Sequence, residues 1–339
     1  AEERVALCCR QGLLARKSPQ LWMERDAETD AFWLNWHQKQ GDIKGHEKVE
    51  DWKVLFKEHE ATYRGAVIAD PKMYRGQLIA LNVAACEDMI VLTPELAGTL
   101  GIEVKIDLRQ RFQTYASAMQ WLWENYQDKL SPHLCDSRDP GLLAYATFDM
   151  AFQWRGLMFW LTGPDEATLP GVNPDEELKV FEKIFSELGA NPVCIGFPHR
   201  DGGYGIGEPQ GVKFFSRFGM ALSCNNHSSN MSVLSGMPLK DLKQPEPIPA
   251  PRLDPTKIYV ALVLSDGDNQ ILWPHFFRSY FDHEAYGSFP LSFGIGPATR
   301  EMQPGVIEWY YKKAARGVPP FFEPTLMRVS LGVSRRCDS

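Results

Sequence analysis

Short apolar segments alternate with helix-forming segments along most of this chain, and the alternation limits its fold more than any other feature. In the first half, the expected strands and helices follow one another at residues 65–69, 77–86, 89–92, 94–100 and 103–106. Thr93 and Gly101 bracket one of these helices, as an N-cap residue and a C-terminal glycine should. Because strands that alternate with helices pair in parallel, we expect an N-terminal doubly wound α/β domain.

A turn-rich segment at residues 131–141, with the sequence SPHLCDSRDPG, interrupts this alternation. We place a domain boundary there, which predicts an N-terminal domain of residues 1–140 and a second domain of residues 141–339. In the second domain the expected strands lie at residues 157–161, 193–197, 220–223, 258–264 and 291–295. A complete (β/α)8 barrel has eight strands. We therefore expect a (β/α) barrel-like domain with parts missing, or a smaller α/β layer.

Composition and motifs exclude several classes of partner. The 339-residue chain has a formal net charge of -7, which argues against nucleic acid because phosphate binding favours a basic surface. No stretch approaches the roughly 20 apolar residues of a membrane span. No GxGxxG follows an expected strand and no CxxC pair is present, so neither a dinucleotide cofactor nor a cysteine metal site is expected. The chain begins at Ala1, so either a signal peptide was removed or the sequence is a fragment; we expect a secreted or extracytoplasmic protein.

Polar residues gather directly after the expected strands of the second half. The carboxyl ends of parallel strands lie at one edge of a sheet, and the loops that follow them converge there. The residues that this rule brings together are His199, Tyr204, Glu208, Asn225, Asn226, Asp266, Asp268 and Asn269. The sequence therefore predicts a site at this edge.

The segment Ser265 to Asn269 (SDGDN) gives the strongest local signal, because a run of apolar residues changes there to two carboxylates, a glycine and an amide. One interpretation is a turn and helix cap formed by Asp268 or Asn269. A second is a Ca²⁺ or Mg²⁺ site built from these oxygens, although the spacing lacks the EF-hand pattern. The third is a catalytic carboxylate at Asp266.

The glycine-rich stretch 202–207 lacks the Lys-Ser/Thr of a phosphate-binding loop, and we expect a flexible loop over a site instead. Glu208 is either the first-turn carboxylate of the next helix or an acid of the site. His199 is either a hydrogen-bonded surface histidine or a ligand-binding residue. Asn225 and Asn226 suit the binding of sugar hydroxyls, and asparagine is also an ordinary loop residue.

Several blocks of the sequence resemble the GxGYxYP family of putative glycoside hydrolases. The resemblance lies at residues 64–109, 207–208, 230–233, 259–270 (YVALVLSDGDNQ), 288–297 (SFPLSFGIGP) and 304–314 (PGVIEWYYKKA). The signature that names the family should follow residue 322 and is absent, and residues 327–339 show neither strand nor helix logic. We therefore expect that the family's C-terminal signature block is missing and that the chain is truncated or altered at this end.

The resemblance implies hydrolysis of a polysaccharide or glycan, a reaction that uses two carboxylates. We expect Asp266 and Glu208 to be that pair, with Asp268 as the alternative, and no metal or cofactor. The expected substrate-binding residues are Asn225, Asn226 and Asn269 for sugar hydroxyls, Tyr204 and Trp273 for stacking, and His199. Two alternatives stay open: a non-catalytic carbohydrate-binding or decayed-enzyme scaffold, and a metal-dependent hydrolase.

Overall fold

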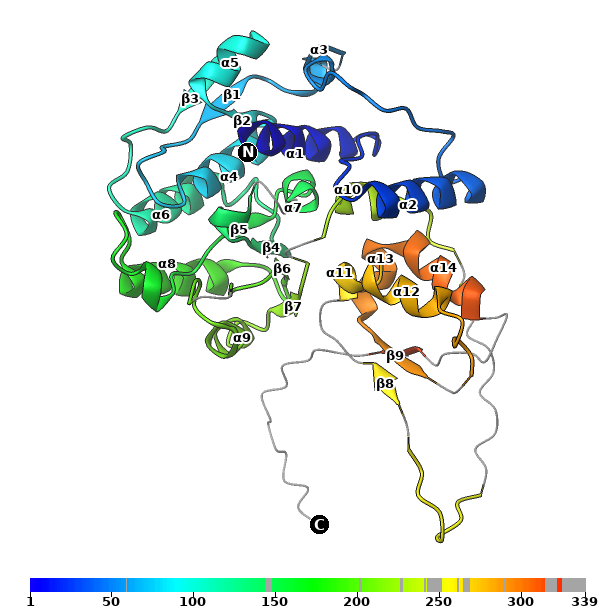
Figure 1. Ribbon diagram of the computed structural model, residues 1–339. Coiled ribbons are helices and arrows are strands. Elements are labelled where there is room, and N and C mark those ends of the chain that lie inside the picture. Colours follow the sequence, from blue (N-terminus) through cyan, green and yellow to red (C-terminus); the bar gives the residue numbers. More distant parts are fainter. Residues whose placement is uncertain are drawn as a thin grey trace, which may run out of the picture. The chain divides into compact units, whose positions relative to one another are not determined.

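The computed structural model (Figure 1) describes residues 1–58, 60–143, 148–200, 203–225, 228–240, 242, 252–260, 262–264, 269–288, 291–314 and 322–324. The chain divides into two compact units. Of the described residues, unit 1 comprises those within Ala1–Met23 and Lys48–Val233, and unit 2 comprises those within Glu24–Glu47 and Leu234–Met327. The boundary expected near residue 140 falls inside unit 1.

Unit 1 contains a three-stranded parallel sheet in the order β2-β1-β3. Its strands are β1 (Ala66–Ile68), β2 (Ile90–Leu92) and β3 (Val104–Asp107), which confirms the strands expected from the alternation. The helices of this part are α1 (Glu2–Ala15), α3 (Val54–Glu58), α4 (Gly76–Glu87) and α5 (Pro94–Leu100), with a 3-10 turn η1 (Glu60–Thr62). Thr93 caps α5 by accepting a hydrogen bond from the backbone N–H of Leu96, and Gly101 ends it in the left-handed conformation.

A second parallel sheet of unit 1 has four strands in the order β5-β4-β6-β7. They are β4 (Leu134–Ser137), β5 (Leu157–Phe159), β6 (Val193–Gly196) and β7 (Ala221–Ser223). Its helices are α6 (Tyr115–Tyr126), α7 (Asp149–Gln153), α8 (Pro174–Glu187), α9 (Glu208–Ser216) and α10 (Met231–Leu234), with 3-10 turns η2 (Pro140–Leu142) and η3 (Pro164–Glu166). Since every strand pair is parallel, all four carboxyl ends lie at one edge.

Helix α4 joins the two sheets of unit 1 into one core. It is buried along nearly its whole length and packs against β1 and β2 of one sheet and β5 of the other. Its Asn82 side chain donates to the carbonyl of Met158 at 2.7 Å and accepts from the Met158 N–H at 2.9 Å. One amide thus satisfies both backbone groups at the outer edge of β5, as a further strand would. The shared core explains why residue 140 lies within unit 1 rather than between units.

Unit 2 contains the parallel sheet β10-β9-β8, formed by β8 (Val263–Leu264), β9 (Ser292–Ile295) and β10 (Phe322–Pro324). Its helices are α2 (Ala27–Gln40), α11 (Asn269–Leu272), α12 (Phe276–Asp282), α13 (Pro297–Met302) and α14 (Pro304–Ala314). Trp33 of α2 donates from Nε1 to the carbonyl of Pro274 at 2.8 Å, which ties this early helix to the unit.

The fold is therefore mixed α/β with parallel sheets. The strands that the structure describes form three separate sheets, and the barrel-like arrangement stays a prediction. No helix among the described residues has the length and apolar character needed to cross a bilayer.

A buried histidine makes the stability of unit 2 depend on pH. The His37 side chain is fully buried in α2, with Nδ1 3.0 Å from Oδ2 of Asp42. Lys240 lies 3.1 Å from Asp42 and 3.0 Å from Glu308 of α14. Burial lowers the pKa of His37, and the neighbouring Asp42 carboxylate only partly offsets this effect.

We expect the wild type to lose more stability than His37→Gln when the pH falls from 7.5 to 5.5. The unfolded chain takes up a proton on His37 near pH ~6.5, whereas the native state resists it, so stability is present above that pH and lost below it. Urea unfolding of both proteins at both pH values measures the difference. An identical loss of stability in the two proteins would remove His37 from this account.

Candidate active site

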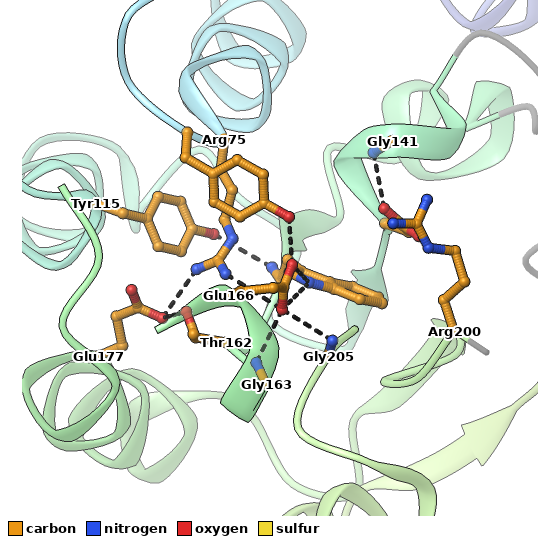
Figure 2. Close-up of polar contacts among 12 residues, drawn as sticks. Arg75, Tyr115, Gly141, Thr162, Gly163, Glu166, Glu177, Arg200 and Gly205 are labelled. Carbon is orange, nitrogen blue, oxygen red and sulfur yellow. Dashed lines mark hydrogen bonds and ion pairs between the residues drawn. The ribbon is translucent and has the colours of Figure 1, made fainter. Parts of the chain in front are cut away.

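The loops that follow β4, β5 and β6 bring a cluster of charged side chains to the carboxyl edge of the second sheet (Figure 2). The turn η2 follows β4, η3 follows β5, and residues 197–207 connect β6 to α9. Helices α4 and α8 add one residue each to the same cluster. The cluster has a buried part, centred on Glu166, and a partly exposed rim formed by Asp139, Arg200 and Tyr204.

Glu166 connects the loop after β5 to the loop after β6. Its Oε2 accepts hydrogen bonds from the backbone N–H groups of Gly163 and Gly205, both at 2.8 Å (Figure 2). Its Oε1 accepts from Nε1 of Trp160 at 3.1 Å and from the hydroxyl of Tyr74. Burial raises the pKa of Tyr74 most, and the nearby Glu166 carboxylate raises it further. The phenol therefore stays protonated and can donate to Glu166.

Arg75 stands between two buried carboxylates. It occupies the N-cap position of α4 in the left-handed conformation (φ 71°). Its Nη1 lies 2.9 Å from Oε2 of Glu177 in α8, and its Nη2 lies 3.7 Å from Oε2 of Glu166. Glu177 also accepts from the hydroxyl of Thr162, and the guanidinium carbon lies 5.0 Å from the centre of the Tyr115 ring. A single cation thus faces two buried carboxylates, and hydroxyl and backbone donors compensate the remaining charge.

The rim of the cluster consists of a buried acid, a partly exposed arginine and an exposed aromatic ring. Asp139 accepts from the Gly141 N–H at 2.7 Å and forms an ion pair with Nε of Arg200 at 2.9 Å. The Arg200 guanidinium carbon lies 4.1 Å from the centre of the Tyr204 ring. The side chain of Asp139 is 6% exposed and that of Arg200 30%, and Tyr204 is 36% exposed. Burial raises the pKa of Asp139, and the Gly141 N–H and the Arg200 charge oppose this shift.

Asp136 contributes a further carboxylate from within β4 itself. Its Oδ2 accepts from Nε and Nη2 of Arg138 at 3.1 and 2.9 Å. Burial raises the pKa of Asp136, against the effect of Arg138, and Asp149 of α7 adds to the rise. Gly196 of β6 (φ 88°) allows this arrangement, since a Cβ there would lie 2.5 Å from Oδ1 of Asp136. Within the described ranges, no group of three His, Cys, Asp or Glu side chains is placed to hold a metal ion.

Four of the site residues expected from the sequence lie among the described residues of unit 1. Tyr204 lies at the rim, and His199 is half-buried beside Arg200. Glu208 is the exposed first residue of α9, and Asn225 is buried directly after β7.

Asp266, Asp268 and Asn226 lie outside the described residues, as does the side chain of Asn269 at the start of α11. The pairing of Glu208 with Asp266 therefore stays a prediction.

Trp273 needs a correction. It is 0% exposed in the core of unit 2, with its ring centre 4.4 Å from that of Tyr310 and 5.1 Å from that of Phe277. Rings that enclose it on this scale leave no face for a sugar, so Trp273 is a core residue rather than a stacking residue.

The structure brings together charged residues that no pattern in the sequence indicates: Arg75, Asp139, Glu166 and Glu177. The sequence carries one signal, because the DSRD run at residues 136–139 puts charged residues next to a Pro-Gly turn, as the SDGDN segment puts Asp266 next to a glycine. The run lies in the turn-rich segment, and for this reason the sequence predicts a domain break there.

The second sheet of unit 1 is parallel and has a polar cluster at its carboxyl edge, the position at which open α/β sheets commonly bind ligands. The chain belongs to the GxGYxYP family. The family's second N-terminal domain matches residues 63–130, its third domain matches residues 133–236, and the "GxGYxYP putative glycoside hydrolase C-terminal domain" matches residues 256–320. No curated protein matches the chain.

One solved structure with a similar fold is a crystal structure of a putative hydrolase from Bacteroides thetaiotaomicron VPI-5482. Its TM-score is 0.77 and its sequence identity 21%, and the match covers 95% of this chain and 60% of that one. At this identity the similarity shows the fold alone. The chain spans about 60% of the length of that protein.

The family match corrects the expectation that the C-terminal block is missing, because the C-terminal domain is represented by residues 256–320. The second and third domain matches adjoin at residues 130 and 133, close to the turn-rich segment at which the boundary was expected.

Proposed function

We propose that this protein hydrolyses glycosidic bonds and that the carboxyl edge of the second sheet of unit 1 holds the sugar. Family membership supports hydrolase chemistry, and the rim supports the location. Glycosidases use a carboxylic acid whose pKa is raised, so that it can protonate the leaving oxygen, together with a second carboxylate. Asp139 meets the first requirement because burial raises its pKa.

The single observation that carries the proposal is the group of Asp139, Arg200 and Tyr204. Arg200 holds the Asp139 carboxyl at 2.9 Å, and its guanidinium lies against the partly exposed ring of Tyr204. Arg200 thus links an aromatic ring, of the kind that stacks on sugars, to a carboxyl that could donate a proton.

For the second carboxylate we retain Glu208 and Asp266, with Asp268 as the alternative. Asn225, Asn226, Asn269 and His199 remain the proposed partners of sugar hydroxyls. We also retain the proposal that the protein acts outside the cytoplasm.

The second candidate function is carbohydrate binding without turnover. The ion pairs of the buried carboxylates favour this function, because a carboxylate that is paired with an arginine is less available for catalysis. Asp136, Asp139 and Glu177 each face an arginine. A metal-dependent hydrolase is the third, and loss of activity with a chelator would favour it.

We expect Asp139→Asn to lower turnover by at least 100-fold on the glycan that the wild type cleaves, as loss of a general acid does. Release of reducing ends from a panel of glycans measures this. Glu182→Gln is the matched control, because Glu182 forms an exposed ion pair with Arg217 at 2.9 Å on the outer helix α8. Glu208→Gln and Asp266→Asn identify the second carboxylate in the same assay.

The dependence of activity on pH tests the role of Asp139 independently. Activity that needs protonated Asp139 falls as the pH rises through the raised pKa of this group, and we expect Asp139→Asn to lack that limb. Unchanged turnover in Asp139→Asn would refute its role. Glycan binding in the wild type without release of reducing ends would support the binding function instead.

A further inference from the structure

A second recess of unit 1 lies at the carboxyl edge of the first sheet, apart from the cluster described above. Its volume is about 330 Å³, and residues that end or follow all three strands line it: Ile68 ends β1, Leu92 ends β2, and Arg109 follows β3. The order β2-β1-β3 means that the chain leaves β1 to one side and later returns to the other (Figure 1). In open parallel sheets such a switch point is where ligands bind.

We propose that this pocket binds a small uncharged molecule that has an apolar body and a hydroxyl group at one end. The volume lies within the roughly 300–1,000 Å³ of small-molecule sites. The walls come mainly from apolar side chains, such as Val5 of α1, Ile68 and Val91. They provide apolar surface for the body of the ligand.

Each charged residue that lines the pocket already lies near an opposite charge or dipole, and this is the reason to expect an uncharged ligand. Glu2 and Glu95 lie in the first turns of α1 and α5, where a carboxylate balances the positive end of the helix dipole. Arg109 forms a two-point ion pair with Asp107, with Nε 3.0 Å from each carboxylate oxygen. An anion would face the Glu2 and Glu95 carboxylates or compete with Asp107 for Arg109, and a cation would face the positive ends of helices α1 and α5 as well as Arg109.

Gln77 supplies the group that would select a hydroxyl. It lies in the first turn of α4 and lines the pocket. Its amide can donate and accept hydrogen bonds, so it suits a hydroxyl, which does both. The ligand class is therefore a small alcohol rather than an anion or an amine.

Three probes that share one ring test the proposal: cyclohexylmethanol, cyclohexanecarboxylate and cyclohexylmethylamine. Their Kd values for the full chain are measured at pH 7 by ligand-observed NMR titration. We expect the alcohol to bind at least tenfold tighter than either charged probe. Equal or tighter binding of a charged probe, or no detectable binding of the alcohol, would overturn the proposal.

Two variants locate the binding. Ala69→Phe fills the pocket from its lining and should abolish alcohol binding, whereas Ala61→Phe, on the exposed turn η1, should leave it unchanged. Gln77→Ala should raise the Kd for the alcohol about fivefold, as loss of one hydrogen bond does. Thermal melting shows whether Ala69→Phe is folded, and Gln77→Ala decides the question if it is not. Wild-type affinity in Gln77→Ala, or in folded Ala69→Phe, would place the binding elsewhere.

Discussion

Glu166→Ala should lower the free energy of unfolding by about 3–5 kcal/mol, because it leaves several buried hydrogen-bond donors without their acceptor, at roughly 1–3 kcal/mol each. The substitution leaves Arg75 facing Glu177 alone and removes the acceptor of the Gly163 and Gly205 N–H groups. Buried donors that lose their acceptor add their own penalty. Urea unfolding followed by circular dichroism measures the change.

Asp165→Ala is the matched control for this substitution. Asp165 is the neighbouring acid in the same 3-10 turn, but its side chain is exposed. Its removal should change stability by no more than about 0.5 kcal/mol. If the free energy of unfolding of Glu166→Ala lay within about 0.5 kcal/mol of the wild-type value, the size of an ordinary surface effect, the network would not hold the two loops together.

Gly163→Ala should destabilise the protein by about 3 kcal/mol, because the loops after β5 and β6 approach too closely for a side chain. A Cβ at Gly163 would lie 2.0 Å from the carbonyl oxygen of Gly205 and 2.7 Å from that of Gly203. Both oxygens belong to the backbone, so neither can move as a flexible side chain would. The effect should also weaken the hydrogen bonds that Glu166 makes to this pair of loops.

Gly98→Ala should have the opposite effect on stability from Gly163→Ala. Gly98 lies within α5, and a Cβ there meets nothing within 4 Å. Alanine should therefore stabilise the helix by about 0.5–1 kcal/mol, through its better helix propensity. Urea unfolding of the two variants side by side gives the comparison. Similar changes in both variants would show that the close approach of the loops is not the cause.

The first sheet could be predicted from the sequence because its strands are short, apolar and separated by well-marked helices. Thr93 and Gly101 bracket α5 as expected. Local signals of this kind are encoded within a few residues of where they act.

Strand β4 could not be predicted in the same way. Its sequence, Leu-Cys-Asp-Ser, places Asp136 and Ser137 at buried positions in the middle of a sheet. A strand that carries buried polar groups lacks the apolar run by which strands are recognised. For the same reason the segment that contains β4 is predicted as a turn-rich break and not as a strand.

The candidate site was predicted only as a region. The rule that sites gather at the carboxyl ends of parallel strands points to the loop that contains Tyr204, and the structure places this residue beside Arg200. The Arg75–Glu177 pair joins residues 102 positions apart, and contacts of that range cannot be derived from spacing in one sequence. Trp273 shows that the residue type alone is also insufficient. A tryptophan can stack on a sugar or lie in the core, and only its neighbours in the structure show that Trp273 is a core residue.

The central claim is that sugar binds at the carboxyl edge of the second sheet of unit 1. The most direct test measures amide hydrogen exchange of the Asp139→Asn variant with and without the intact glycan that the wild type cleaves. The variant should bind the glycan without consuming it. We predict slower amide exchange in the segments 139–143, 163–166 and 203–207. Slowed exchange confined to other segments, or no change in these three at saturating glycan, would contradict the account.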